Sequence, residues 1–233
     1  FDPSPFTSNP FEESIEAAAS SSSSSRSLPD IAYGKATWEK HFKMVEGTEG
    51  PLPDDIEEIL NSSAPFAVEG YSGKVRDTHL LVWIPEKVNG IKVSLDGLKE
   101  LFGKYERYDN TLKRELGAKG VSSHWVLVSK NVLKGTRSKS YADQKTIMAA
   151  YASQGYTLPN ALDIATAVLL HQKEKGEYLL GPRIYTRGQE GIDNSQWPAA
   201  IGGFAAGGLY VTYYDLGISG VGASGARKFC VSS

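Results

Sequence analysis

Residues 201–225 read IGGFAAGGLYVTYYDLGISGVGASG, and residues 226–229 continue as ARKF. Glycines recur here between short runs of β-branched and aromatic residues, without the three-to-four-residue hydrophobic spacing of a helix. Val, Thr and Tyr favour strands, whereas glycine permits tight turns and close approach of neighbouring backbones. The pattern begins near Gly181 and predicts a series of short strands joined by tight loops.

The residues before this region predict a mixture of helices and strands. Hydrophobic spacing and capping residues favour helices over 33–45, 52–60, 94–105, 140–155 and 158–176. Apolar runs predict buried strands over 78–84 and 123–129, and Asn89-Gly90 predicts a hairpin turn. Because strands and helices do not alternate regularly, we expect an α+β fold with helices packed on short, twisted, mostly antiparallel strands.

Composition excludes several classes of function. The chain has 233 residues, a formal net charge of −2, four scattered histidines and one cysteine, Cys230. This charge argues against a nucleic-acid partner, and a single cysteine excludes an internal disulfide or a cysteine-cluster metal site. No stretch reaches the roughly 18 apolar residues of a membrane span. Phosphate-loop, dinucleotide and nucleophile-elbow motifs are missing, so we expect no metal, no cofactor and no enzymatic activity.

Residues 1–30 differ in composition from the rest of the chain. They are rich in Ser and Pro and carry five acidic residues against one arginine. Such a segment buries too little apolar surface to offset its ordering entropy, which predicts a flexible or extended arm before a domain over 31–233. Pro5-Phe6 and Asn9-Pro10-Phe11 fit either a docking motif or an ordinary tail. No leader pattern is visible, although secretion or surface display is the favoured location.

The second half also resembles a known family. Leu158-Pro159 opens a helix, Gly202-Gly203-Phe204 begins a strand, and Gly225-Ala226-Arg227 begins the closing strand. This combination resembles the C-type-lectin-like fold, in the branch that contains formylglycine-generating enzymes, over about residues 120–230. Within that branch the terminal segment is most similar to the variable ligand-binding proteins of diversity-generating retroelements. The resemblance implies a domain core at 120–230 and a hypervariable binding surface.

The chain also departs from that family. Phe204 stands where the branch more often has Ser-Trp, and the calcium motifs of sugar-binding lectins are missing. The catalytic members need two cysteines to hold their metal, whereas this chain has only Cys230. The resemblance therefore implies a binding surface rather than oxidase activity. The framework residues that it implies are Arg187, Gly202, Gly203, Gly225 and Arg227.

The tyrosine-rich run in the terminal segment has the composition of a binding surface. Tyrosine provides a large contact area at low entropic cost, and Ser and Gly provide adaptable spacing, as in antibody binding loops. Strand alternation places Tyr210, Thr212 and Tyr214 toward solvent, with Val211 and Phe229 packed beneath. An ordinary edge strand would show similar residues. The candidate ligand contacts are Ala205, Ala206, Tyr210, Thr212, Tyr213, Tyr214, Asp215 and Ser219.

Other polar residues leave two alternative classes open. The cationic loop with Lys130, Lys134, Arg137 and Lys139 fits an anion site or a solvated loop. His124 and His171 fit structural positions. An enzyme or secreted effector would build its site from His124, Arg137, Asp143 and Arg187, so two of these would lie within hydrogen-bond reach in a cleft. A structural subunit would order the arm against a neighbour, as a homo-oligomer or in a larger assembly.

Overall fold

A computed structural model of the chain describes residues 27–193, 197–214 and 220–229. Most of the Ser/Pro-rich arm, together with Asp215, Ser219 and Cys230, lies outside these residues. The elements follow in this order: β1 (Ala32–Tyr33), α1 (Lys35–His41), β2 (Val45–Glu46), α2 (Ile56–Asn61), α3 (Val75–Thr78), β3 (His79–Ile84), β4 (Lys87–Val88), β5 (Ile91–Lys92), α4 (Leu95–Phe102), β6 (Tyr105–Tyr108), α5 (Asn110–Leu116), β7 (His124–Ser129), α6 (Tyr141–Ala149), η1 (Ala152–Gln154), α7 (Ala161–Lys175), β8 (Tyr185–Ile192), β9 (Trp197–Ala205), β10 (Gly208–Tyr213), β11 (Val221–Gly222) and β12 (Ala226–Phe229).

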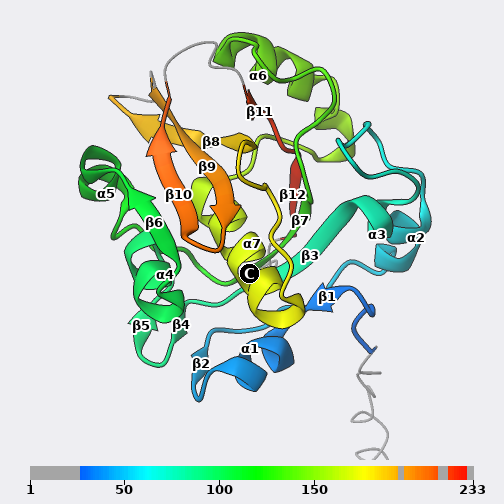
Figure 1. The fold of residues 1–233 in the computed structure, drawn as a ribbon. Helices are drawn as coiled ribbons and strands as arrows, with labels where there is room; N and C mark the ends of the chain where they lie inside the picture. Colours follow the sequence, from blue (N-terminus) through cyan, green and yellow to red (C-terminus); the bar gives the residue numbers. More distant parts are fainter. Residues whose placement is uncertain (1–26, 194–196, 215–219, 230–233) are drawn as a thin grey trace, which may run out of the picture.

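The fold is of the α+β class, with two main sheets arranged around one helix (Figure 1). One sheet has the order β1-β3-β7-β12, and the other has the order β11-β8-β9-β10-β6. Most pairings are antiparallel, as expected; β1–β3, β6–β10 and β8–β11 are parallel. A small sheet, β2-β4-β5, completes the described strands.

Helix α7 packs against strands of both main sheets, so it forms the centre of the core. Every residue from Ala161 to His171 is buried. Burial therefore extends beyond one apolar stripe such as Ile164, Ala167 and Val168, because a helix enclosed between two sheets has no solvent face along most of its length.

The core extends beyond residues 120–230. Strands β3 and β7 form the fully buried centre of the first sheet, with Trp83 opposite Trp125. Strand β6, which also precedes residue 120, forms one edge of the five-stranded sheet. Both main sheets therefore include strands from the first half of the chain.

Local sequence signals set several element boundaries. The Ser94 hydroxyl accepts a hydrogen bond from the Gly97 amide and caps α4, and Ser140 caps α6 in the same way. Asn89 and Gly90 both have positive φ angles, as a tight hairpin turn between β4 and β5 requires. Gly176, at φ 77°, ends α7 in the left-handed conformation.

Several expected helices are shorter in the structure, among them the first, the second and α4. The first ends at His41, because Val45 pairs with Val88 in the small sheet instead of continuing the helix. The second begins at Ile56 rather than near residue 52, after the two prolines of the preceding loop. Helix α4 ends at Gly103, whose φ of 59° stops the helix before Tyr105 joins β6.

Candidate ligand-binding face

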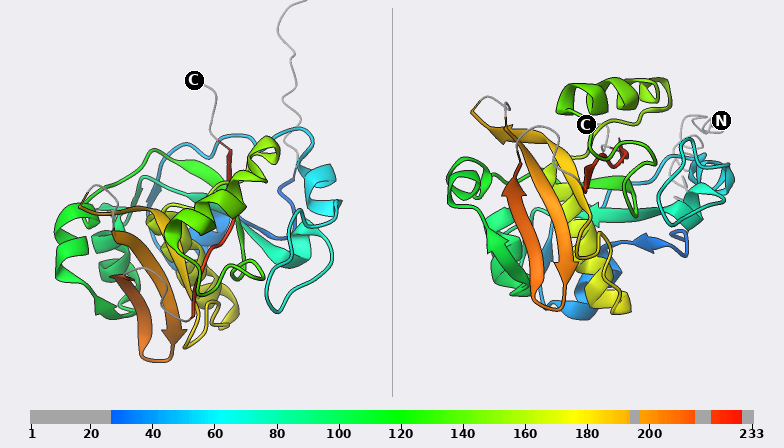
Figure 2. Two further views of the ribbon diagram at one scale, coloured as in Figure 1. Left: turned by 90° about the horizontal axis from the view of Figure 1, so that it is seen from above. Right: turned by 45° about the horizontal axis from the view of Figure 1, so that its top comes forward.

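The five-stranded sheet has one face against α7 and one face turned away from it (Figure 2). Thr186, Ile201 and Val211 are aligned across β8, β9 and β10 and are buried. The residues that alternate with them point to the other face. Two rows therefore cross this outward face. The open row contains Tyr185, Gly202 and Tyr210, and the covered row contains Arg187, Ala200 and Thr212.

Three tyrosines form a cluster around the open row. The Tyr185 ring meets the Tyr214 ring edge to face at 5.3 Å between centroids, and it meets the Tyr210 ring edge to face at 6.2 Å. All three side chains are partly exposed. Edge-to-face contacts hold the rings relative to one another without covering their outer surfaces. We call Tyr185, Tyr210 and Tyr214 the tyrosine cluster.

Neighbouring groups raise the pKa of two members of the cluster. The Tyr210 hydroxyl donates a hydrogen bond to Glu106 Oε1 at 2.8 Å, and this bond raises the pKa of Tyr210. Burial, together with Tyr214, raises the pKa of Tyr185 to about 12. The hydroxyl groups of Tyr185 and Tyr210 therefore remain neutral hydrogen-bonding groups at physiological pH.

The Gly202-Gly203 pair makes room for the cluster. Gly203 has a φ of 59°, a left-handed conformation that a residue with a Cβ adopts only at a cost. A Cβ at Gly203 would also lie 2.5 Å from the Tyr185 hydroxyl. The pair thus lets the Tyr185 ring lie close to the sheet, which gives these two framework glycines a physical role.

The loop before α6 closes the covered row at Arg187. Arg187, only 1% exposed, donates hydrogen bonds to the Lys139 carbonyl at 3.1 Å and to Gln144 Oε1 at 3.0 Å. Gln144 Nε2 donates to the carbonyls of Thr136, at 2.8 Å, and Val221, at 3.2 Å. Arg187 and Gln144 therefore tie the 136–140 loop and β11 to the sheet.

This arrangement corrects one sequence prediction. Thr212 is 3% exposed rather than open to solvent, although it shares the outward face with Tyr210. Strand alternation predicts the face correctly, but it does not reveal that another segment covers part of that face. Val211 and Phe229 are buried, as expected.

The other candidate contacts fall into three groups. Tyr213 lies on the opposite face, where its ring meets Trp197 at 6.3 Å, so it is not part of the cluster. Ala205 and Ala206 lie at the hairpin between β9 and β10, partly exposed and exposed respectively. Asp215 and Ser219 lie outside the described residues.

Sequence reasoning missed several neighbours of the cluster. Tyr185 and its approach to Tyr210 depend on the register of β8, β9 and β10, which a single sequence does not specify. Arg107 lies opposite Tyr210 on the neighbouring strand β6, far away in sequence. The only usable signal was the alternation in Tyr185-Thr186-Arg187, which places Tyr185 and Arg187 on one strand face.

A hollow of about 520 Å³ adjoins the tyrosine cluster. Its lining residues are Arg137, Ser138, Pro182, Arg183, Tyr185, Tyr214, Gly220 and Val221. Tyr185 and Tyr214 are thus shared between the cluster and the hollow. Aromatic rings, arginine side chains and a serine hydroxyl here surround a space of the size typical of ligand pockets.

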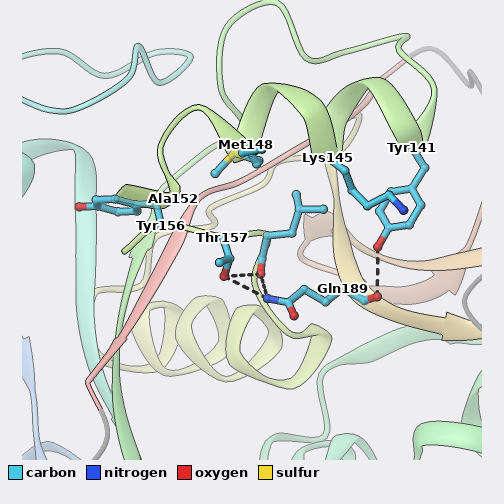
Figure 3. A pocket seen from close by; sticks show the side chains of 9 residues that line it. Tyr141, Lys145, Met148, Ala152, Tyr156, Thr157 and Gln189 are labelled. Atoms are coloured by element: carbon cyan, nitrogen blue, oxygen red, sulfur yellow. Dashed lines mark hydrogen bonds between the residues drawn. The ribbon is translucent and has the colours of Figure 1, made fainter. Parts of the chain in front are cut away.

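A second hollow, of about 540 Å³, lies along α6 and is shown in Figure 3. Gln189 donates hydrogen bonds to the Thr157 hydroxyl and to the Leu158 carbonyl, and the Tyr141 hydroxyl donates to the Gln189 carbonyl. The Lys145 ammonium lies over the Tyr141 ring, 4.8 Å from its centroid. These polar groups already satisfy one another, so this hollow offers a ligand less than the one beside the tyrosine cluster.

The residues of the enzyme alternative bind different partners. Arg137 forms an ion pair with Glu69, and Asp143 accepts a hydrogen bond from the Ser140 hydroxyl. His124 Nε2 lies 3.0 Å from Asp163 Oδ1, while Arg187 binds Gln144 as described. The four residues are thus each engaged in separate structural contacts rather than with one another.

His124 belongs to a buried tie between three elements. Its Nδ1 lies 2.8 Å from the Ser122 carbonyl, and Asp163 also lies 2.9 Å from the Lys228 ammonium. These contacts join β7, α7 and β12, which agrees with a structural role for this histidine. Within the described part of the chain, no three His, Cys, Asp or Glu side chains gather in a way that could hold a metal ion.

Comparisons with known proteins add no assignment. No family model matches the chain, and searches of curated proteins and of solved structures find no match either. Among the helices that the structure describes, none is long and apolar enough to cross a membrane.

Proposed function

We propose that this protein is a non-enzymatic binding protein that presents the tyrosine cluster to a protein or glycan ligand. One observation carries the proposal: three partly exposed tyrosine rings pack edge to face on the outward side of a sheet, beside a hollow. The adjacent covered row is tied down by Arg187 and Gln144.

The physical advantage of this arrangement is preorganisation. A tyrosine side chain has few rotatable bonds, and mutual ring contacts restrict it further before any ligand arrives. Less entropy is therefore lost on binding, which raises the affinity obtained from a given contact area. The hydroxyl groups of Tyr185 and Tyr210, whose pKa values are raised, are neutral at physiological pH and can hydrogen-bond with ligand groups.

We also propose a C-type-lectin-like scaffold, with a surface diversified as in retroelement-encoded variable proteins. Support comes from the order of motifs: the Gly202-Gly203-Phe204 strand, then the tyrosine-bearing strand β10, then the closing strand β12. The encoding nucleotide sequence tests the diversification. Enrichment of codons reachable from AAC or AAT over residues 205–219, with a near-copy repeat nearby, is the expected result; ordinary codons without a repeat would refute it.

The binding function can be tested by screening the full chain against a glycan array and a panel of purified cell-surface proteins. The wild type should bind a defined ligand, and a Tyr210→Ala/Tyr214→Ala double variant should bind it at least tenfold more weakly. Central tyrosines in interfaces often contribute about 2 kcal/mol or more. Tyr178→Ala provides the matched control, because Tyr178 is exposed but lies outside the cluster.

The melting temperature of each variant must be measured alongside binding. A double variant that remains folded and binds as the wild type does would refute the proposal. A double variant that is unfolded would show that the tyrosines are structural, which would also refute it.

A further inference from the structure

Arg183 lies on the wall of the hollow and has no acidic partner among the residues that the structure describes. It is exposed, and no carboxylate among the described residues lies within ion-pair distance of it. Tyr185 and Tyr214 line the same hollow. An unpaired guanidinium next to aromatic rings can form charge-assisted hydrogen bonds with an anionic ligand group.

Arg137 contributes a second guanidinium in a fixed position. Its Nε and one terminal nitrogen, Nη2, donate to the Glu69 carboxylate. The other terminal nitrogen, Nη1, has no hydrogen-bond acceptor among the residues that the structure describes. Glu69 neutralises the charge of Arg137 but also orients it, so Arg137 offers the hollow a directed donor while Arg183 supplies the net positive charge.

The wall that carries Arg137 is held rigidly. Gln144 binds the carbonyls of Thr136 and Val221, and Arg187 binds the carbonyl of Lys139. Ser138 lies in the chain between Thr136 and Lys139, whose carbonyls accept these hydrogen bonds, and it has a φ of 58°. A residue with a Cβ adopts this left-handed backbone conformation only when its surroundings impose it. The hollow therefore has a defined shape before a ligand binds.

We infer that this hollow is a subsite for the anionic group of an acidic glycan, such as a sulfated or carboxylated sugar unit. The inference rests on the proposed binding function and specifies its ligand. Sugar rings stack on exposed tyrosine rings, and Arg183 with Arg137 would bind the sulfate or carboxylate. Arg107 lies opposite Tyr210 at the other end of the cluster, where the Glu106 carboxylate offsets its charge, so the anion-binding character is confined to the hollow.

The shape of the site favours a glycan over an acidic peptide. A protein partner typically needs roughly 800 Å² of surface on each side. Here the features that point to an anion are concentrated in a hollow of about 520 Å³, within the size range of pockets that enclose small ligands. A charged sugar unit fits such a hollow with its ring against the tyrosines.

Calorimetric titration of the full chain with three probes tests the inference: a sulfated disaccharide from heparin, the same disaccharide without sulfate, and an acidic peptide of equal charge. The sulfated probe should bind most tightly, and its affinity should fall as salt is raised. Arg183→Gln should weaken it about tenfold, because a charge-assisted hydrogen bond is removed. Arg114→Gln, an exposed arginine on α5, should change nothing.

The outcomes separate this inference from the proposed function. Equal binding of the sulfated probe by wild type and Arg183→Gln, or no binding at all, would refute the anionic subsite, as would tighter binding of the peptide. If a neutral ligand from the array loses affinity in the Tyr210→Ala/Tyr214→Ala variant, the binding face stands although the subsite has failed. If neither set of variants alters any binding, both proposals fail.

Discussion

The open row and the covered row lie on the same face of the same sheet, two residues apart, yet they differ completely in environment. Tyr185 and Tyr210 are partly exposed, whereas Arg187 and Thr212 are buried, and Arg187 is hydrogen-bonded to the 136–140 loop. The strand pattern is the same in both rows, so the difference comes from a segment elsewhere in the sequence. Rigidity and recognition are thereby separated along one strand: the covered row holds the fold, and the open row is free to contact a ligand.

The largest effect is expected in the covered row. Arg187→Met should lower the free energy of unfolding by about 3 kcal/mol, because the hydrogen bonds of a buried charge are lost and its former acceptors remain buried. At about 2–4 °C per kcal/mol for a chain of this size, the melting temperature should fall by about 6–12 °C. Arg183→Met, at an exposed arginine before the same strand, should leave melting nearly unchanged. Equal melting temperatures for Arg187→Met and Arg183→Met would show that the buried arginine contributes no more to stability than the exposed one.

Acid should destabilise the buried core before it affects the tyrosine cluster. Burial lowers the pKa of His79 to about 3, so this histidine is neutral in the folded protein. The unfolded chain takes up a proton near pH 6.5, so stability falls as the pH drops from 6.5 toward 3. The loss at pH 5 should be about 2 kcal/mol.

His79→Phe tests this source of pH dependence. Its stability should depend less steeply on pH between 6.5 and 5, as measured by urea unfolding across that range. Tyr185 stays neutral there, since its pKa is raised to about 12. If the free energy of unfolding changed equally steeply with pH in the wild type and the variant, His79 would not be kept neutral by burial.

A smaller effect is expected where the glycine pair meets the cluster. Gly203→Ala places a Cβ on a residue with a φ of 59°, which should cost about 1 kcal/mol, and it pushes against the Tyr185 hydroxyl. Gly181→Ala is the matched control, because a Cβ there meets nothing within 4 Å. Urea unfolding should separate the two, and Gly203→Ala should also weaken ligand binding. If Gly203→Ala changed neither the free energy of unfolding nor ligand binding, Gly203 would not have the role assigned to it.

Helix ends and turns were predictable from the sequence where one or two residues determine them. Ser94 and Ser140 cap their helices, Asn89-Gly90 forms its turn, and Gly176 ends α7, each through interactions within a few residues. The side-chain alternation of β10 was also correct.

The composition of the site was only partly predictable. Tyr210 and Tyr214 were identified from local composition, but Tyr185 joins them through sheet register, and Arg183 joins through the shape of the hollow. Thr212 was misplaced because strand alternation predicts which face a residue occupies but not whether tertiary packing buries it. Hydrophobic periodicity does not encode contacts between segments that are distant in the sequence, and these contacts could not be predicted.

The central claim is that the tyrosine cluster contributes to binding and not to folding. The most direct test measures both free energies for Tyr214→Ala: unfolding by urea, and binding of the ligand that the array identifies. We predict a change in unfolding free energy below about 1 kcal/mol and a loss of binding free energy of about 2 kcal/mol or more. A variant that loses stability but keeps its affinity would contradict the account, because Tyr214 would then belong to the core.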